Sequence, residues 1–203
     1  MKVMKVFVMF MLGIWIILPG CKNDAPTEPN IPHETGSMTD IDGNEYGTVK
    51  IGDQWWMAEN LKTTRTADGS VLSGVFVYND DESYISEYGR LYTWEAAMNA
   101  CPAGWHLPSD AEWEILIRTL GSEPGTKLKV GGSSGFNAKM AGFRANGEYG
   151  YLGSFGLFWT STASSNIDHA VQKLIVSDES GVITDNIPVE TALSVRCILN
   201  TQN

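Results

Sequence analysis

The clearest pattern of apolar and polar residues in this chain lies between residues 109 and 121. Apolar side chains recur there at intervals of three and four residues, which places them on one face of a helix. These side chains are Trp113, Leu116, Ile117 and Leu120. Ser109 and Glu112 have the spacing of a capping box, in which each side chain bonds the main-chain amide of the other residue. We therefore predict a helix that starts at Ser109, ends before Gly121 and packs its apolar face on a core.

Alternating residues predict strands before this helix. Residues 45–51 and 54–57 flank a Gly-Asp turn, which is the pattern of a β-hairpin. Neighbouring residues of a strand point to opposite faces of the sheet. We therefore expect one of Trp55 and Trp56 to lie in the core and the other to be partly exposed.

Other segments carry shorter patterns. We expect a strand over residues 71–78 and a helix from about Thr93 to just before Cys101. Glycine and serine are frequent in residues 121–156, which favours loops. Strand patterns then occur at residues 158–162, 170–176, 181–183 and 193–199. The alternation in the last of these places Cys197 on the side that faces the core.

The start of the chain has the pattern of a secretory signal peptide. Residues 1–20 contain two lysines followed by an apolar run of about 13 residues, short of the roughly 20 that span a membrane. Leu18-Pro19-Gly20-Cys21 resembles the lipobox of bacterial lipoproteins, which implies cleavage before Cys21 and lipidation of its thiol. Residues 21–38 are rich in proline and poor in apolar side chains, so we expect a flexible tether to a folded domain at 39–203.

Composition supports one globular domain, and the cysteine count together with a cell-envelope location supports a disulfide. The chain has 203 residues, of which 43% are hydrophobic and 10% aromatic, and this is enough for one core. A formal net charge of −10 and the lack of clustered Lys and Arg argue against a nucleic-acid partner. If Cys21 is lipidated, Cys101 and Cys197 remain as an even pair. A cell-envelope location permits a disulfide between them.

Six segments of the chain carry a resemblance to a known family. They are Asp42 to Tyr46, Val49 to Leu61, Tyr88 to Trp94, Cys101 to Glu114, Trp159 to Thr162 and Ser194 to Ile198. Together they resemble the Fibrobacter succinogenes major paralogous domain family of bacterial surface lipoproteins, over roughly residues 39–199. Residues 106–114 are also similar to a signature of the formylglycine-generating enzyme superfamily, although His106 stands where that signature has arginine.

The resemblance implies an α+β fold of the C-type lectin-like type. Such a fold has two short helices, mixed or antiparallel sheet and long loops. The resemblance also implies a location in the bacterial cell envelope, as an outer-membrane lipoprotein that contacts the membrane through its lipid. It implies no biochemical activity.

Metal motifs in this sequence are incomplete. Asp40, Asp42 and Asn44 resemble the start of a calcium loop, but Ile51 stands where the last carboxylate ligand is needed. Glu28-Pro29-Asn30 matches a sugar-selecting tripeptide of calcium-dependent lectins, but it lies in the expected tether. We therefore expect no metal site and no cofactor.

Catalytic motifs are incomplete as well. An oxidase of the formylglycine-generating type needs reactive thiolates, and a Cys101–Cys197 bridge leaves neither thiol free. A hydrolase triad would have to use His106 or His169, which we interpret as a structural and a surface residue.

We therefore expect a non-catalytic binding, adhesion or assembly role. Carboxylates are numerous in an acidic chain, so a hydrolase or modifying enzyme acting on envelope glycans stays open as an alternative. A purely structural surface protein is the third possibility. A concave pocket with converging acids would favour the enzyme, whereas an exposed aromatic patch would favour binding.

The resemblance also indicates where a ligand would bind, because C-type lectin-like folds usually use their long irregular loop region. Here this region corresponds to about residues 131–168. We expect Tyr149, Tyr151, Asn166 and Asp168 to contact a glycan or a surface protein, since tyrosine rings combine apolar area with polar tips. The competing interpretation is that the tyrosines only cover a glycine-rich half of the core.

Overall fold

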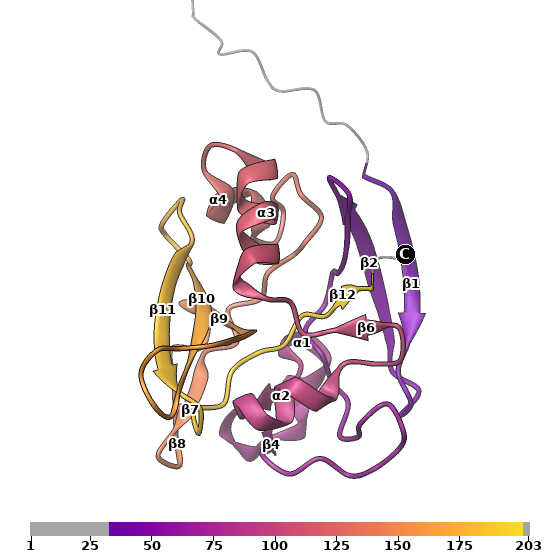
Figure 1. Cartoon of the computed structure of the whole chain (residues 1–203), viewed down its shortest axis with the longest axis vertical. Coiled ribbons are helices and arrows are strands. Elements are labelled where there is room, and N and C mark those ends of the chain that lie inside the picture. Colours follow the sequence, from indigo (N-terminus) through magenta and orange to yellow (C-terminus); the bar gives the residue numbers. More distant parts are fainter. Residues whose placement is uncertain (1–32, 201–203) are drawn as a thin grey trace, which may run out of the picture. The chain divides into compact units, whose positions relative to one another are not determined.

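The structure, a computed structural model, describes residues 33–200. The predicted signal peptide, the predicted lipidation site Cys21, the tripeptide at residues 28–30 and most of the expected tether lie outside these residues. The described residues form an α+β fold with antiparallel sheets and short helices (Figure 1). No helix within them is both long enough and apolar enough to cross a membrane.

The larger sheet has five strands in the order β1, β2, β3, β12 and β6. Their bounds are Thr35–Thr39, Glu45–Ile51, Gln54–Met57, Ile198–Leu199 and Trp105–His106. Strands β2 and β3 form the predicted hairpin with the predicted bounds. The hairpin turns at Gly52, whose φ of +59° favours glycine. Trp56 is fully buried and Trp55 is half-buried, which confirms the expected division between them.

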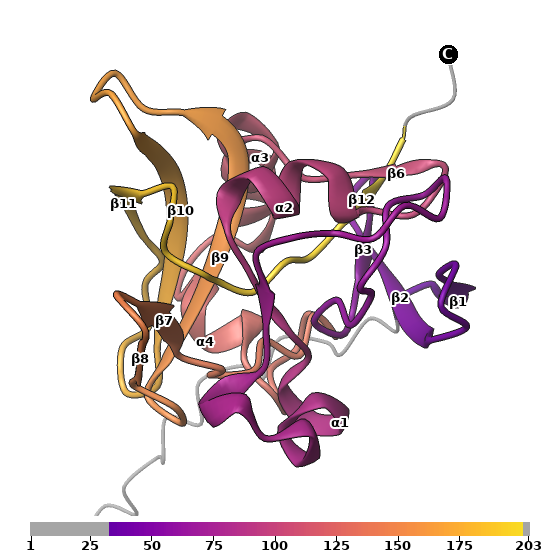
Figure 2. The same cartoon turned by 90° about the horizontal axis from the view of Figure 1, so that it is seen from below.

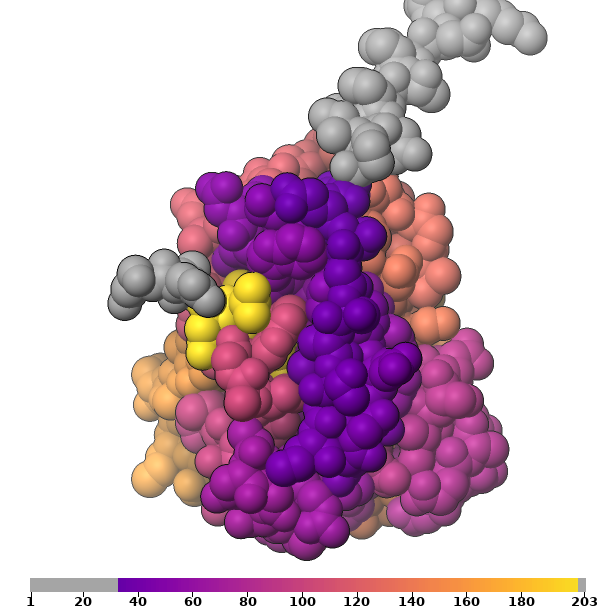
Figure 3. All heavy atoms as spheres, turned by 90° about the vertical axis from the view of Figure 1, so that its right-hand side faces the viewer, coloured from indigo at the N-terminus to yellow at the C-terminus, as the bar shows by residue number. Residues whose placement is uncertain are grey.

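Strand β1 begins inside the segment that we expected to be a tether up to residue 38. It pairs antiparallel with β2 along its whole length, at the surface edge of the sheet (Figure 3). His33 also contacts this domain, through the main-chain oxygens of Lys50 at 3.2 Å and Ser133 at 2.9 Å. Apolar alternation does not reveal β1 because main-chain pairing holds it and most of its side chains are exposed. The folded part of the chain therefore begins before residue 39.

The smaller sheet has three antiparallel strands, with β10 between β11 and β9. The bounds are Phe155–Ala163 for β9, His169–Val176 for β10 and Ile183–Pro188 for β11. Strands β9 and β10 occupy regions in which strands were predicted. Strand β11 begins only at Ile183, the last residue of the predicted position, because its pairing with β10 begins where Ile183 faces Leu174.

Two helices follow the predictions. Helix α2 spans Trp94–Ala100 and helix α3 spans Asp110–Leu120. Ser109 and Glu112 form the predicted capping box, and Gly121 ends α3. The buried face of α3 consists of Trp113, Leu116 and Leu120.

The remaining elements are short. They are β4 (Val75–Phe76) paired with β5 (Leu91–Tyr92), β7 (Phe143–Ala145) paired with β8 (Glu148–Gly150), helices α1 (Ile85–Tyr88) and α4 (Pro124–Leu128), and 3-10 turns at Tyr78–Asp80 and Glu82–Tyr84. The strand predicted over residues 71–78 is therefore wrong for most of its length. Only Val75 and Phe76 form a strand, because β5 offers two partners before Thr93 caps helix α2, and Val71 makes only an isolated bridge with Arg65.

Residues 191–198 cross from the smaller sheet to the larger one and are buried along their whole length (Figures 1 and 2). We call them the crossing segment. The strand predicted at 193–199 is wrong here, since only Ile198–Leu199 is regular. No continuous ladder forms because the main chain changes partner every one or two residues. The main-chain partners along the segment include Arg144, Tyr92, Leu157, Trp159, Leu61 and Met57.

The crossing segment contributes to two apolar cores. The first core contains α2 side chains together with Val195 and Cys197, so Cys197 faces the core as predicted. The second contains α3 side chains, residues of the larger and of the smaller sheet, and Ile198. Ser194 and Arg196, which alternation placed away from the core, are fully buried as well. The alternation predicts exposed side chains at these two positions, and this prediction is wrong because both faces of the segment are covered.

The side chain of Arg196 is fully buried and donates to four oxygens. Nε donates to Asn60 Oδ1 at 2.7 Å, Nη1 to Met57 O at 3.0 Å and Phe136 O at 2.5 Å, and Nη2 to Asn137 O at 2.9 Å. Burial lowers the pKa of Arg196 to about 9, so the guanidinium stays charged at neutral pH. A buried charge of this kind needs all of its hydrogen-bond partners in place.

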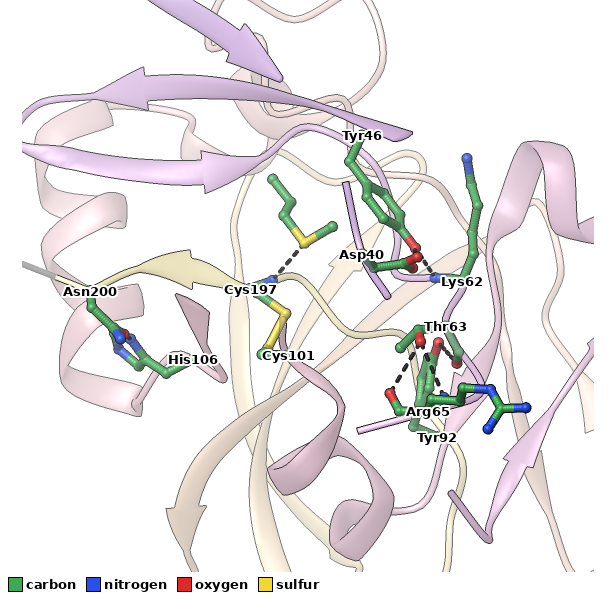
Figure 4. The surroundings of a disulfide bond; sticks show 11 residues. Asp40, Tyr46, Lys62, Thr63, Arg65, Tyr92, Cys101, His106, Cys197 and Asn200 are labelled. Atoms are coloured by element: carbon green, nitrogen blue, oxygen red, sulfur yellow. Dashed lines mark hydrogen bonds between the residues drawn. A yellow bond between two sulfur atoms is a disulfide. The ribbon is translucent and has the colours of Figure 1, made fainter. Parts of the chain in front are cut away.

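A disulfide joins Cys101, directly after α2, to Cys197 in the crossing segment (Figure 4). This is the predicted pair, and the two Cα atoms lie 5.8 Å apart. The amide of Cys197 also donates to Met57 Sδ at 3.4 Å. The end of α2 is thus tied to the segment that links the two sheets.

Removing this disulfide should destabilise the domain. The cysteines are 96 residues apart, and closing such a loop in the unfolded chain contributes about 4 to 5 kcal/mol, less any native strain or residual structure. In urea denaturation, Cys101→Ala/Cys197→Ala should unfold at a lower midpoint than the oxidised wild type. Its urea midpoint should be close to the midpoint of the wild-type protein measured in reductant. Equal midpoints for the variant and the oxidised wild type would contradict this expectation.

Candidate functional site

The four residues predicted to bind a ligand lie in two separate places. Tyr149 and Tyr151 lie near the start of β9, where the Tyr151 ring stacks on Phe155, whereas Asn166 and Asp168 lie in the loop after β9 ends. Strand β9 has nine residues, so its ends lie about 26 Å apart at about 3.3 Å per residue. Figure 2 shows the β7–β8 hairpin and the β9–β10 loop at opposite ends of the smaller sheet. The four residues therefore do not form the single binding surface that we expected.

Tyr149 is held by contacts within the fold. Its hydroxyl donates to Asp80 Oδ1 at 2.5 Å, and its ring centroid lies 5.3 Å from that of Tyr78. The guanidinium of Arg144 lies over the ring at 5.7 Å. Burial and then the hydrogen bond to Asp80 raise the pKa of Tyr149. These contacts agree with the competing interpretation, in which this tyrosine covers the glycine-rich half of the domain.

Tyr151 is the exposed member of the pair. Its side chain is 56% exposed, and its ring stacks parallel on Phe155 with 4.4 Å between the ring centroids. Its φ of +60° lies in the left-handed region that bulky side chains rarely adopt. Tyr151 thus presents aromatic area at the end of β9 opposite to Asn166 and Asp168.

Asn166 and Asp168 line a cavity of about 580 Å³ beside the start of α2. We call it the Trp94 pocket. Other residues of its lining come from α2, from the β9–β10 loop and from the chain after β11. They include Trp94, Glu95, Ile167, His169, Val189 and Glu190. Small-molecule sites in proteins have volumes of roughly 300 to 1,000 Å³, so the Trp94 pocket has the size of a ligand site.

Main-chain pairing brings the parts of the Trp94 pocket together. The amide of Trp94 donates to Val189 O at 3.0 Å, and the amide of Val189 donates to Asp168 O at 3.0 Å. The side chain of Thr93 caps α2 and so determines where the helix begins. The indole N–H of Trp94 donates to Thr160 O at 2.8 Å, which orients the ring. The indole therefore has a defined position in the lining.

The carboxylates in this lining are not neutralised by the protein. Glu95, Asp168 and Glu190 are exposed, and within residues 33–200 their carboxylates make no hydrogen bond and no ion pair. The side-chain amide of Asn166 has no partner among the described residues either. His169, which we interpreted as a surface residue, begins β10 and is half-buried in the lining. The pocket thus presents free polar groups around an oriented aromatic ring.

Sequence reasoning identified Asn166 and Asp168 but missed Trp94, Glu95 and Glu190. These residues are distant in the chain, and only long-range main-chain pairing brings them together. The sequence contained one indication that Trp94 could matter. Trp94 is the last residue of a segment that carries the family resemblance. We interpreted that tryptophan only as part of one face of the helix from about Thr93.

A family model described as the Fibrobacter succinogenes major domain matches residues 49–199. The chain belongs to this family. Comparisons with curated proteins and with solved structures gave no significant match. The matched span of the Fibrobacter succinogenes major domain contains the disulfide, the crossing segment and the Trp94 pocket, whereas β1 precedes it.

A serine, a histidine and an acid meet at the capping box of this Fibrobacter succinogenes major domain. His106 Nε2 lies 2.8 Å from Glu112 Oε1, and Ser109 Oγ donates to Glu112 Oε2 at 2.7 Å. The carboxylate lies between the other two groups, whereas a nucleophilic triad needs the histidine in that position. Burial raises the pKa of Glu112, but hydrogen bonds from Ser109 and His106 outweigh burial and lower it below its usual value. The three groups therefore cap a helix.

The acids of the incomplete calcium loop bond to the protein itself. Asp42 accepts hydrogen bonds from Thr64 and forms an ion pair with Arg65 at 3.2 Å. Asp40 accepts from the hydroxyl of Tyr46 at 2.6 Å. Across residues 33–200, no three His, Cys, Asp or Glu side chains are grouped as the ligands of a metal ion would be.

Proposed function

We propose that this protein is a lipid-anchored protein of the bacterial outer membrane whose domain binds a ligand in the Trp94 pocket without altering it. One observation carries the proposal. A cavity of about 580 Å³ combines an oriented indole with free polar side chains. This combination is typical of small-ligand sites. The ligand would be a glycan or part of a surface protein, and its binding would serve adhesion or assembly.

We also propose that the fold is a variant of the C-type lectin-like fold. The two longest helices, α2 and α3, the antiparallel sheets and the loop-rich half support this relation. The segment at residues 106–114, which resembles the formylglycine-generating enzyme signature, forms the end of β6 and the start of α3. In folds of this type the loops bind ligands, and the β9–β10 loop is part of the Trp94 pocket.

The state of the candidate catalytic groups supports a non-catalytic role. Cys101 and Cys197 form a disulfide, so neither thiol is available for oxidase chemistry of the formylglycine-generating type. Glu95, Asp168 and Glu190 are exposed, and no hydrogen bond within the described residues orients them. Catalytic acids and bases, in contrast, are held within hydrogen-bond reach of the reacting group.

An enzyme that acts on envelope glycans is the second candidate function. Three carboxylates line one pocket, and most glycoside hydrolases use a pair of them. The two functions differ in the fate of the ligand. A glycan is recovered intact from a binding module, whereas a hydrolase returns it cleaved.

The lipid anchor is supported by residues 1–21, which lie outside the described structure. They combine two lysines, an apolar run and the segment Leu18-Pro19-Gly20-Cys21. More than one acyl chain would make the anchor stable, because a single chain binds membranes only marginally.

Cys21→Ser should move the protein from the membrane fraction to the soluble envelope fraction, because the thiol that carries the lipid is lost. Fractionation with immunoblotting and mass analysis of the mature protein would measure this. Cys101→Ala/Cys197→Ala, which leaves Cys21 in place, should remain with the membrane. An unacylated, soluble wild-type protein that starts at another residue would contradict the anchor.

The unanchored Cys21→Ser protein should retain at least one ligand from arrays of envelope glycans and surface proteins. Asn166→Ala/Asp168→Asn should weaken this binding at least about tenfold, because both side chains line the pocket. Tyr151→Ala, at the other end of β9, should leave it unchanged.

Four results would count against this proposal. Wild-type affinity in Asn166→Ala/Asp168→Asn would exclude the Trp94 pocket as the site. Loss of binding in a folded Tyr151→Ala would place the site at the opposite end of β9. Recovery of a cleaved glycan would favour the enzyme, and the absence of any ligand would favour a purely structural protein.

A further inference from the structure

We infer that the Trp94 pocket selects a glycan that carries a free ammonium group, as an amino sugar without its acetyl group does. This inference rests on the proposed function, because it names the class of ligand for the same pocket. The cavity defines the site. Its charges and its aromatic ring define what fits there.

The sign of the charges around the cavity favours a cation. Glu95, Asp168 and Glu190 contribute three carboxylates to the lining, and neither lysine nor arginine is part of it. None of the three forms an ion pair within residues 33–200. A recess lined by charges of one sign concentrates their electrostatic potential. The chain as a whole also has a formal net charge of −10. The Trp94 pocket should therefore attract cations and repel carboxylates and phosphates.

In a second cavity, the acidic residues of the lining are neutralised by lysines of the protein. This cavity has a volume of about 410 Å³, and its lining contains Glu59, Lys62, Glu87 and Lys139. Lys62 Nζ lies 2.9 Å from Glu59, and Lys139 Nζ lies 3.8 Å from Glu87. Each carboxylate there faces an ammonium group of the protein. In the Trp94 pocket, the ligand would supply that group.

The indole adds a second reason to expect an ammonium group. The N–H of Trp94 already donates to Thr160 O at 2.8 Å, so the ring offers a ligand its aromatic surface rather than its donor. Aromatic rings attract ammonium groups through their quadrupole, and tryptophan does so most strongly. Trp94 and the three carboxylates therefore favour the same chemical group.

The remaining features of the lining favour a sugar over an isolated lysine side chain. A cavity of about 580 Å³ has room for more than one alkylammonium group. The free amide of Asn166 can donate to and accept from hydroxyl groups. Ile167, which is 86% exposed, adds apolar contact area. These groups match the hydroxyls and the carbon-bound hydrogens of a sugar ring next to its amine.

Calorimetric titration of the full-length protein in detergent tests this inference with three probes. The probes are a trisaccharide of glucosamine, the same trisaccharide with every amine acetylated, and trilysine. We expect the glucosamine trisaccharide to bind at least about tenfold more tightly than its acetylated form. Added salt should weaken the binding, because charges at an exposed site are screened.

Two matched variants localise the effect. Asp168→Asn/Glu190→Gln removes two negative charges from the pocket, and asparagine tolerates the positive φ of Asp168. This variant should lose the preference for the free amine. Glu45→Gln/Asp53→Asn removes two exposed charges elsewhere and should retain it. Equal melting temperatures would show that both variants are folded.

Each contrary result has a distinct meaning. Equal affinity for the free and the acetylated trisaccharide would overturn ammonium selection and leave the proposed binding function intact. Tighter binding of trilysine would overturn the choice of a glycan. Binding of none of the three probes would overturn the inference, and the array screen would then decide the proposed function by itself.

Discussion

The buried guanidinium of Arg196 is the constraint on which the rest of this fold depends. A charged group without water is stable only when hydrogen bonds replace those it loses. Its acceptors come from two distant parts of the chain. Met57 and Asn60 lie at and just after the end of β3, and Phe136 and Asn137 lie in the loop-rich half. Those parts must therefore meet at the crossing segment. A long loop region without regular structure obtains a defined position in this way.

The crossing segment also determines where the Trp94 pocket forms. Leu193 exchanges two main-chain hydrogen bonds with Tyr92, which places the start of α2 beside the chain that leaves β11. Trp94 then pairs with Val189, and the disulfide at Cys101 holds the other end of the helix. Helix α2 is thus fixed at both ends. The pocket at its start is built from rigid parts although its residues are far apart in the sequence.

Local interactions explain what the sequence predicted correctly, and long-range pairing explains what it did not. The capping box of Ser109 and the β2–β3 hairpin depend on neighbours in the chain, so their patterns were sufficient. Strand β1 and the crossing segment depend on partners elsewhere. Most side chains of β1 are exposed, so it lacks apolar alternation, whereas the crossing segment alternates but is covered on both faces. For the site, the resemblance indicated the loop that contains Asn166 and Asp168. It could not show that Trp94 would join them there.

The most direct test of this account is hydrogen exchange, read by mass spectrometry, in Arg196→Lys. Lysine keeps the charge but has three donors on a flexible stem instead of five in a planar fork, so it cannot reach all four acceptors. We expect protection to fall in both cores together, with a loss in free energy of unfolding of about 1.5 to 3 kcal/mol for each charged hydrogen bond removed. Wild-type protection in both cores, or a loss confined to one of them, would contradict the claim that Arg196 joins the two halves.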